Sequence, residues 1–237
     1  MSKIEEKLNI VEENIQAACE RAGRSRDELR LVAVTKTAAP EQVVEAVRLG
    51  CTNLGENRLQ HFSEIRQAAE NSEEISELLP GVRWHMIGHM QRNKAKHFLP
   101  LMDMLHSLES LKLAGVLNKL LAEQRRKLEA FIQINCSREE QKYGVPASEA
   151  AEFAARLAEH ENIIPAGIMT MAVFEASEKH LHETFALARE TLTKARKALP
   201  ENLREGFSRL SMGMTNDYKI AVEEGATDLR IGSAIFA

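Results

Sequence analysis

The chain has 237 residues, and its 31 Lys and Arg against 35 Asp and Glu give a formal net charge of −4. This mildly acidic balance, with 5% aromatic residues, argues against a general nucleic-acid-binding protein. A chain of this length buries roughly 70% of its extended surface, which is enough for one sizeable core. The three cysteines, Cys19, Cys51 and Cys136, are odd in number and widely spaced, which indicates a reducing compartment rather than a disulfide framework.

Neither a signal peptide nor a membrane span is predicted. The first six residues already contain acids, and the longest uncharged stretch, Asn162–Phe174, is shorter than the about 20 residues that a spanning helix needs. We therefore expect a cytoplasmic protein that is not bound to a membrane. The chain has no long apolar seam that would require a dimer, so a monomer is expected.

The elements alternate along the chain. Apolar residues at helical spacing predict an amphipathic helix over Ile4–Ala22, and the β-branched run Leu31–Thr35 is typical of a buried parallel strand. Pro40 begins a helix that ends near Gly50. Further strands are predicted at Asn53–Leu54, Val82–Ile87, Met102–Leu105, Ala130–Asn135, Ile164–Thr170, Phe207–Ser211 and Thr227–Ile231. Further helices are predicted at Arg58–Ala69, Asn93–Phe98, Ser110–Lys127, Ala147–Glu159, Lys179–Leu199 and Thr215–Glu224.

Eight strands alternating with helices predict one α/β domain over residues 1–237, a (β/α)8 TIM barrel with an extra N-terminal helix. The alternative, an open doubly wound sheet, needs a glycine-rich turn after its first strand. The turn here, Lys36–Ala39, contains no glycine. The pattern therefore favours the barrel.

Chemistry in such a barrel is expected at the carboxyl ends of the strands. The first strand ends at Lys36. A buried Lys must be paired or neutral, and a neutral amine at a barrel mouth is what Schiff-base chemistry requires. The alternative is a Lys that extends into solvent.

The last two predicted strands end in small residues and hydroxyls, in Ser211–Thr215 and in Arg230–Ser233. Backbone N–H groups and hydroxyls at such turns favour an anion, although ordinary capping explains either turn alone. Phosphate often binds after strands seven and eight of a barrel. With Lys36, this placement indicates pyridoxal phosphate.

Several motifs carry a resemblance to a known family. They are Val32–Thr37, Gly55–Asn57, Trp84–Lys94, the spaced set Asn135, Glu139, Lys142 and Gly144, then Gly167–Met171, Ser211–Thr215 with Asp217, and Arg230–Phe236. In this order they resemble the YggS/PROSC family of pyridoxal-phosphate-binding proteins, the pyridoxal phosphate homeostasis proteins. The resemblance implies a fold like the N-terminal barrel of alanine racemase, without that enzyme's second domain.

The resemblance also implies roles for single residues. Lys36 would hold pyridoxal 5'-phosphate as an internal aldimine, Arg230 would face the pyridine nitrogen, and Asn57 would lie near the ring hydroxyl. The phosphate would be taken by Ser211, Gly232 and Ser233, with backbone help near Met212 and Gly213. Two departures stand out: Thr215 occupies a position where Ser is common, and the chain stops at Ala237, so the last turn is expected to be less tied down.

The residues predict a binding protein with no catalytic residue rather than an enzyme. Arg offers only donors, so Arg230 would bond to a neutral ring nitrogen and weaken the ring as an electron sink. The resemblance implies a homeostasis role: the protein would hold pyridoxal phosphate, buffer it and deliver it to apo-enzymes. The alternative is a racemase-like enzyme, but such a racemase needs a second base, and Tyr143 and Tyr218 are expected to have surface or packing roles.

Three other patterns have competing explanations. A Schiff-base aldolase would use Lys36 with Glu56 as acid or base, whereas a surface Glu that caps the next helix is the ordinary alternative. His85 and His89 have the spacing of a metal pair, but they fall on a strand and a turn and lack a third ligand. The cluster Arg92, Lys94 and Lys96 is explained by a solvated helix start.

Overall fold

The computed structural model describes residues 1–136 and 143–237. Eight parallel strands form the predicted closed barrel, in the order β4-β3-β2-β1-β9-β8-β7-β5, and pairing between β5 and β4 closes it. The two-residue strand β6 pairs with β5 outside this ring. The strands are β1 (Arg30–Val34), β2 (Asn53–Glu56), β3 (Arg83–Met86), β4 (Met104–Leu108), β5 (Leu128–Asn135), β6 (Val145–Pro146), β7 (Ile163–Met169), β8 (Arg209–Ser211) and β9 (Asp228–Ile231).

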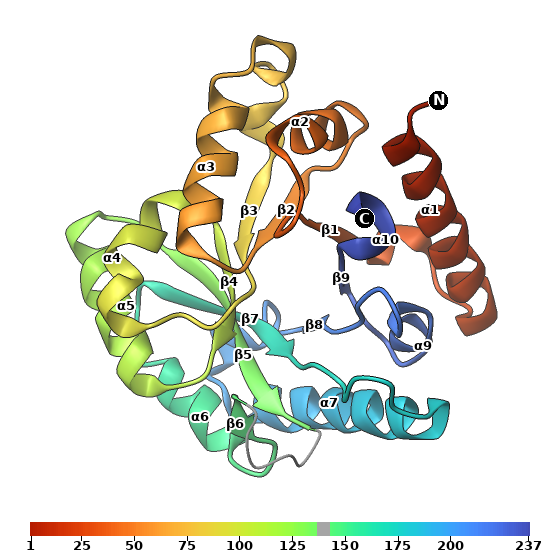
Figure 1. Ribbon diagram of the computed structural model, residues 1–237. Helices are drawn as coiled ribbons and strands as arrows, with labels where there is room; N and C mark the ends of the chain where they lie inside the picture. Colours follow the sequence, from red (N-terminus) through yellow and green to blue (C-terminus); the bar gives the residue numbers. More distant parts are fainter. Residues whose placement is uncertain (137–142) are drawn as a thin grey trace.

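Helices surround the barrel (Figure 1). They are α1 (Lys3–Ala22), α2 (Pro40–Arg48), α3 (Leu59–Glu70), α4 (Ala95–Phe98), α5 (Leu111–Glu123), α6 (Ala150–Leu157), α7 (Glu178–Ala198), α8 (Glu201–Arg204), α9 (Tyr218–Glu223) and α10 (Ser233–Phe236). The main core lies between the strands and these helices, where alternate strand residues such as Leu54, Leu105 and Leu229 are fully buried. Because successive side chains of a strand point to opposite faces, the residues between them point into the barrel interior.

The extra N-terminal helix is present, as predicted. A capping box begins α1, because the Ser2 hydroxyl accepts from the Glu5 backbone N–H at 3.1 Å and the Glu5 carboxylate accepts from the Ser2 backbone N–H at 3.2 Å. The helix ends at Gly23 in the left-handed conformation (φ 63°). Figure 1 shows α1 beside α10 and the C-terminus, and Arg21 pairs with Glu223 on α9 at 2.8 Å. This helix thus covers the side of the barrel on which β9 pairs with β1.

The last turn differs from the sequence expectation. Ile235 is fully buried and Phe236 is 6% exposed. The Gln42 amide on α2 donates to the Phe236 carbonyl at 3.4 Å. The expectation of a loosely held last turn was therefore wrong, because two apolar side chains of α10 anchor it in the core.

Strand β4 also differs from its predicted range, since it runs on to Leu108. The sequence places His106 and Ser107 where an apolar strand should end, yet both are buried. Each has a polar partner: His106 contacts His85 and Ser211, and the Ser107 hydroxyl donates to the Gly88 carbonyl at 2.6 Å. Hydrogen bonding offsets the cost of burying these side chains, so the strand continues through them.

A small apolar cluster of Met104, Phe131, Ala166 and Met169 lies inside the barrel. Toward the amino ends of the strands this cluster gives way to charges. There Arg209 forms ion pairs with the fully buried Asp228 and, at 3.1 Å, with Glu129, which also pairs with Arg83 at 3.2 Å. This end of the barrel is therefore closed by a paired network.

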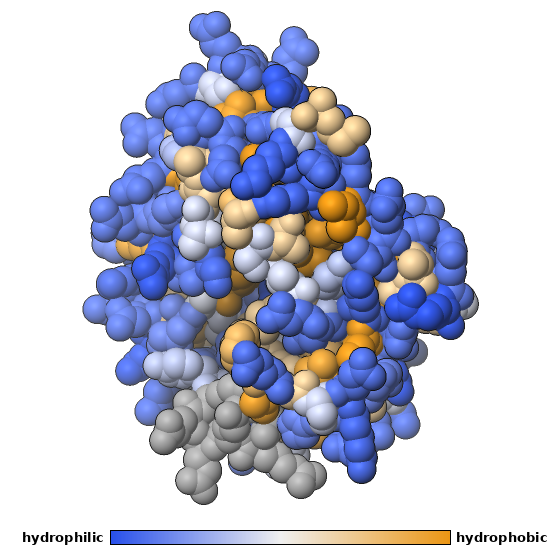
Figure 2. Space-filling view, turned by 45° about the vertical axis from the view of Figure 1, so that its right-hand side comes forward, coloured by the Kyte–Doolittle hydropathy of each residue, from blue (hydrophilic) through white to orange (hydrophobic). Residues whose placement is uncertain are grey.

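Among residues 1–136 and 143–237, no helix combines the length and the apolar character needed to cross a membrane. The three cysteines are unpaired thiols, each of them buried. Burial is the largest cause that raises the pKa of the Cys51 thiol to about 12. On the face shown in Figure 2 hydrophilic side chains predominate, and hydrophobic ones form small groups between them.

Candidate functional site

Lys36 is the second residue after β1, at the carboxyl end of the barrel. It is exposed, so its side chain does not have the burial that the sequence argument considered. The preceding residue is anchored. The Thr35 backbone N–H donates to the Gly55 carbonyl at 2.9 Å, and the Thr35 hydroxyl donates to the Glu56 carboxylate. Lys36 is therefore attached to a fixed strand end, with its side chain exposed.

Asn57 follows β2, which is the neighbour of β1 in the barrel. The turn after β3 packs directly on its backbone. A Cβ added to Gly88 would lie 2.4 Å from the Asn57 carbonyl oxygen, closer than any side-chain carbon can approach. Glycine at position 88 therefore permits the contact that holds Asn57 near the mouth.

The turns after β8 and β9 meet on the other side of β1. The Arg230 backbone N–H donates to the Gly213 carbonyl at 2.9 Å, which ties the turn after β8 to β9. Gly213 has φ +92°, and a Cβ there would lie 2.7 Å from that of Ala221. Gly232 brings β9 close to β1, since a Cβ on it would lie 2.9 Å from the Val34 carbonyl oxygen. The carboxyl ends of β8, β9 and β1 therefore form one continuous rim.

Two hydroxyls face each other on this rim. The Ser233 hydroxyl donates to that of Thr215 at 3.1 Å, and Ser233 is exposed. Ser233 begins α10, whose first backbone N–H groups have no partner within the helix. The turn that carries Thr215 is fixed from behind, because Asp217 accepts a hydrogen bond from the Met214 backbone N–H. Hydroxyls and amides gathered in this way are suited to an anion.

The structure does not bring Ser211 to this rim, where it was expected beside Gly232 and Ser233. Ser211 is the last residue of β8 and is fully buried. Its hydroxyl contacts His106 Nδ1 at 2.7 Å and accepts from Arg230 Nη1 at 2.6 Å. The reason is that Ser211 is still part of β8, where its side chain points into the barrel. Thr215 lies four residues farther along, in the turn after the strand.

Arg230 lies on β9 with its side chain inside the barrel, and it is 4% exposed. Besides the bond to Ser211, its Nη2 donates to the Thr170 carbonyl at 2.9 Å. Burial lowers the pKa of Arg230 to about 10, and the carboxylates of Asp217 and Asp228 oppose that shift. The guanidinium remains charged at neutral pH, so a positive donor lies below the mouth.

Glu56 does not have the expected surface position. It is fully buried at the end of β2, and its Oε1 contacts His61 Nδ1 at 3.1 Å as well as the Thr35 hydroxyl. Within the described residues its Oε2 has no hydrogen-bond partner. The expectation of a surface Glu that caps the next helix was therefore wrong, because the carboxylate instead ties β1, β2 and α3 together.

His85 and His89 lie apart, as their predicted elements implied. His85 is buried in β3, whereas His89 lies in the following turn, where its Nδ1 pairs with Glu109 at 2.9 Å and its ring stacks on Tyr143 at 4.2 Å. In the described ranges no group of three or more His, Cys, Asp or Glu side chains is arranged to hold a metal ion. Arg92, Lys94 and Lys96 are exposed, as expected of a solvated helix start.

The two tyrosines have the roles that the sequence predicted. Tyr143 is 60% exposed and Tyr218 is buried in α9 at 5% exposure. Two motif residues of the spaced set, Glu139 and Lys142, lie outside the described residues.

Comparison with known proteins places this site in a class. The family described as alanine racemase, N-terminal domain, matches residues 7–237. An alanine racemase from Clostridium difficile shares the fold with a TM-score of 0.73 at 14% identity, and the match covers 99% of this chain and 56% of that one. The class is thus a barrel of the alanine racemase type, as predicted.

More similar relatives define the family within this class. A protein of Aquifex aeolicus named pyridoxal phosphate homeostasis protein is 32% identical over 231 residues, which is 98% of this chain and 96% of that protein. The structure of PipY from Synechococcus elongatus with PLP bound has a TM-score of 0.82 and 28% identity, covering 99% of this chain and 100% of that chain. The chain therefore belongs to the pyridoxal phosphate homeostasis protein family, which confirms the resemblance drawn from its motifs.

Two residues of the site were missed in the sequence. Thr215 stands in a recognised motif, and its place at the end of the glycine-containing stretch Ser211–Thr215 marked it as a second hydroxyl for an anion. His106 had a weaker signal, a polar residue at the end of an apolar run. Its role depends on β3 and β8, which lie far away in the sequence, so no local pattern could assign it.

Proposed function

We propose that this protein binds pyridoxal 5'-phosphate and acts in intracellular pyridoxal phosphate homeostasis. The observation that carries the proposal is the rim formed by the carboxyl ends of β8, β9 and β1. The exposed Lys36 follows β1, and the hydroxyls of Thr215 and Ser233 meet after β8 and β9. The guanidinium of Arg230 on β9 is buried below this rim. The names of the relatives and the PLP bound to PipY support the same assignment. The bound cofactor supplies a reactive aldehyde, and the protein supplies an amine to hold it.

The residues present fit the parts of this cofactor. Lys36 would be the amine that bonds to the aldehyde, and Asn57, which follows the neighbouring strand β2, would lie toward the ring hydroxyl. Thr215, Ser233 and the backbone around Gly232 and Gly213 form the anion cradle for the phosphate. Arg230 provides the donor for the ring nitrogen. Ser211 acts through Arg230 rather than on the phosphate, since its hydroxyl already accepts from that guanidinium.

We further propose that the protein holds and delivers the cofactor without robust catalysis. A guanidinium cannot supply a proton to the ring nitrogen, so the ring stays a poor electron sink. Tyr143 is 60% exposed and its ring stacks on His89, and Tyr218 is buried in α9, so neither tyrosine is proposed as a second base. The arrangement therefore favours reversible storage and transfer to apo-enzymes over racemisation.

Absorbance spectroscopy and borohydride reduction test the cofactor assignment. Wild-type protein loaded with pyridoxal phosphate should show a visible band that borohydride removes, and mass spectrometry should then find the reduced adduct on Lys36. Lys36→Ala should lose both the band and the adduct. Lys94→Ala, which removes an exposed lysine on another turn, should keep both. An adduct that persists in Lys36→Ala would refute the assignment.

A deuterium experiment tests the absence of robust catalysis. The loaded protein is incubated with a panel of amino acids in deuterated water, and incorporation at the α-carbon is followed by NMR. We expect no incorporation beyond that caused by free pyridoxal phosphate. Rapid, Lys36-dependent exchange with any amino acid would instead identify a racemase-like enzyme.

A further inference from the structure

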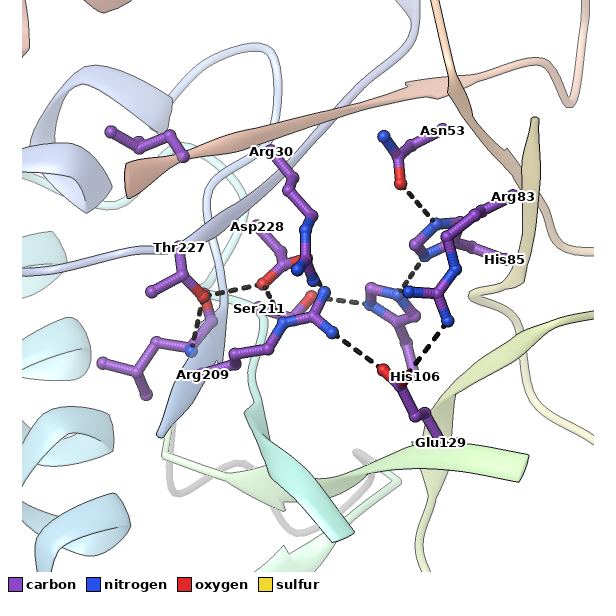
Figure 3. Close-up of polar contacts among 12 residues, drawn as sticks. Arg30, Asn53, Arg83, His85, His106, Glu129, Arg209, Ser211, Thr227 and Asp228 are labelled. Carbon is purple, nitrogen blue, oxygen red and sulfur yellow. Dashed lines mark hydrogen bonds and ion pairs between the residues drawn. The ribbon is translucent and has the colours of Figure 1, made fainter. Parts of the chain in front are cut away.

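A chain of hydrogen bonds crosses the barrel interior and ends at Arg230. Figure 3 shows this chain from Asn53 through His85 and His106 to Ser211. The Asn53 Oδ1 atom on β2 contacts His85 Nε2 at 3.1 Å, and His85 Nδ1 contacts His106 Nε2 at 2.8 Å. His106 Nδ1 then contacts the Ser211 hydroxyl at 2.7 Å, and this hydroxyl accepts from Arg230 Nη1 at 2.6 Å. Five strands, β2, β3, β4, β8 and β9, thus contribute one residue each.

The direction of every bond in this chain follows from its two ends. The Asn53 amide nitrogen donates to the Thr52 hydroxyl at 3.1 Å, so its oxygen faces His85 and must accept from His85 Nε2–H. A neutral His85 then accepts at Nδ1 from His106 Nε2–H, and His106 accepts at Nδ1 from the Ser211 hydroxyl. The Ser211 oxygen is left to accept from Arg230. The chain therefore satisfies every donor and acceptor only when both histidines carry their proton on Nε2.

Burial keeps both histidines neutral, as this order requires. His85 and His106 have no exposed surface. Burial, as the largest cause, lowers the pKa of His85 to about 3 and the pKa of His106 well below its usual value. The charged groups that face them, Arg30, Arg83 and Arg209 from the amino end and Arg230 from β9, act in the same direction, while Asp228 opposes them.

We infer that Ser211, His106 and His85 are positioning residues that hold the Arg230 guanidinium as a fixed hydrogen-bond donor below the barrel mouth. This inference rests on the proposed function, in which Arg230 meets the ring nitrogen of pyridoxal phosphate. Ser211 Oγ and the Thr170 carbonyl together immobilise two nitrogens of the guanidinium. A donor held in one orientation selects a ring with an unprotonated acceptor nitrogen and rejects a ring whose nitrogen is cationic.

The hydrogen-bond chain does more than fill the interior of the barrel. Apolar side chains could fill the same volume without the cost of burying two imidazoles, as Met104 and Phe131 do in the same layer. A purely structural network would also have no need to end on an arginine. The polar chain therefore has an orienting role at its Arg230 end.

The first test needs no cofactor. In ¹⁵N NMR spectra of the apo-protein, with assignment by His85→Asn and His106→Asn, both imidazoles are expected to be neutral and protonated on Nε2 from pH 5 to pH 8. This measurement reports the direction of the hydrogen bonds directly and is independent of pyridoxal phosphate binding. A proton on Nδ1 of His106 would reverse the order of the bonds and overturn the inference.

The second test measures discrimination at the ring nitrogen. The affinities of each variant for pyridoxal phosphate and for its N1-methyl analogue, whose ring nitrogen is cationic and cannot accept a hydrogen bond, are compared by fluorescence titration. Wild type should prefer pyridoxal phosphate strongly. Ser211→Ala should reduce this preference by roughly tenfold, because a hydrogen bond to a charged group is lost.

Two variants serve as controls. Ser211→Thr keeps the hydroxyl and should retain the preference. Met104→Ala creates a cavity in the same interior layer, two residues before His106, and should lower thermal stability without changing the ratio of the two affinities. An unchanged ratio in Ser211→Ala, or an equal fall in Met104→Ala, would overturn the inference. Failure of wild type to bind either compound would instead refute the proposed function. The NMR measurement of the histidine tautomers would then still test the order of the hydrogen bonds.

Discussion

The hydroxyl of Thr35 donates a hydrogen bond to the buried carboxylate of Glu56, and this contact joins the ends of β1 and β2 one residue before Lys36. Both side chains have no exposed surface. A buried carboxylate needs partners, so Glu56 fixes the strand end that carries Lys36. The rigidity of the mouth on this side thus depends on a residue that is itself fully buried.

Replacing Thr35 tests this anchoring. Thr35→Val keeps the shape of the side chain but leaves Glu56 without its hydroxyl donor, and it should lower the free energy of unfolding by about 1–3 kcal/mol. Thr35→Ser retains the donor and should lose less. Urea denaturation of the apo-proteins measures the difference. Equal stabilities of the Val and Ser variants would show that the hydroxyl does not stabilise this strand end.

Gly213 allows the turn after β8 to approach α9. Gly213→Ala places a Cβ at φ +92° and 2.7 Å from the Ala221 Cβ, so it should destabilise the protein by about 2–4 kcal/mol and weaken phosphate binding. Gly81→Ala is the control, since a Cβ there meets nothing within 4 Å. Thermal unfolding and titration with inorganic phosphate measure the two effects. A Gly213→Ala variant as stable as Gly81→Ala would contradict the packing argument.

The buried histidines predict an acid-labile fold. The pKa of His85 falls from 6.5 to about 3 on folding, so the unfolded chain binds a proton that the folded chain excludes between these values. Stability is therefore complete above pH 6.5 and declines as the pH falls, by about 1.4 kcal/mol per pH unit for each such histidine. Asp217 and Glu109, whose pKa values are raised by burial, act in the opposite direction, but only nearer their own lower pKa range.

Urea denaturation between pH 7.5 and pH 5 measures this slope. His85→Gln removes one titrating imidazole and should make the slope shallower by about 1.4 kcal/mol per pH unit below pH 6.5. Replacement of the half-exposed His182, which contacts Glu224 at 2.8 Å, provides a control that should leave the steep slope in place. A slope unaffected by His85→Gln would mean that His85 is protonated in the folded state.

The architecture could be predicted because its signals are local. Apolar runs alternating with amphipathic segments place eight strands, and Pro40 and Gly50 mark the limits of a helix in the sequence itself. The positions of Lys36, Asn57 and Ser233 at strand ends follow from the same pattern. Parallel strands bring their carboxyl ends to the same edge of the sheet. A residue that follows a predicted strand is therefore expected at the mouth of the barrel.

The roles of the interior polar residues could not be predicted in this way. Whether Ser211 faces the phosphate or the barrel interior depends on where β8 ends relative to β4 and β9, and a shift of one residue reverses the direction of a strand side chain. Glu56 looks like a surface residue until Thr35 and His61 are placed around it. These roles depend on partners from strands that are distant in the sequence. A single sequence does not show which of those side chains come into contact.

The ion pair between Arg209 and Asp228 at the amino end of the barrel gives the last prediction. Asp228 is fully buried, and Arg209 also reaches Glu129 at 3.1 Å and stacks 4.9 Å over the Phe131 ring. Arg209→Met would leave the Asp228 carboxylate in the interior with only the Thr227 hydroxyl and the distant Arg30 guanidinium as partners. Such a loss should cost about 3–5 kcal/mol, because the uncompensated charge remains buried.

Removing that charge as well should restore much of the stability. In the double variant Arg209→Met with Asp228→Asn, the buried carboxylate is gone, so the double variant should be more stable than Arg209→Met alone. A double-mutant cycle from urea denaturation yields the coupling energy of the pair. Additive losses from the two substitutions would contradict the ion pair. Because this network lies at the end of the barrel opposite Lys36, pyridoxal phosphate affinity should change far less than stability.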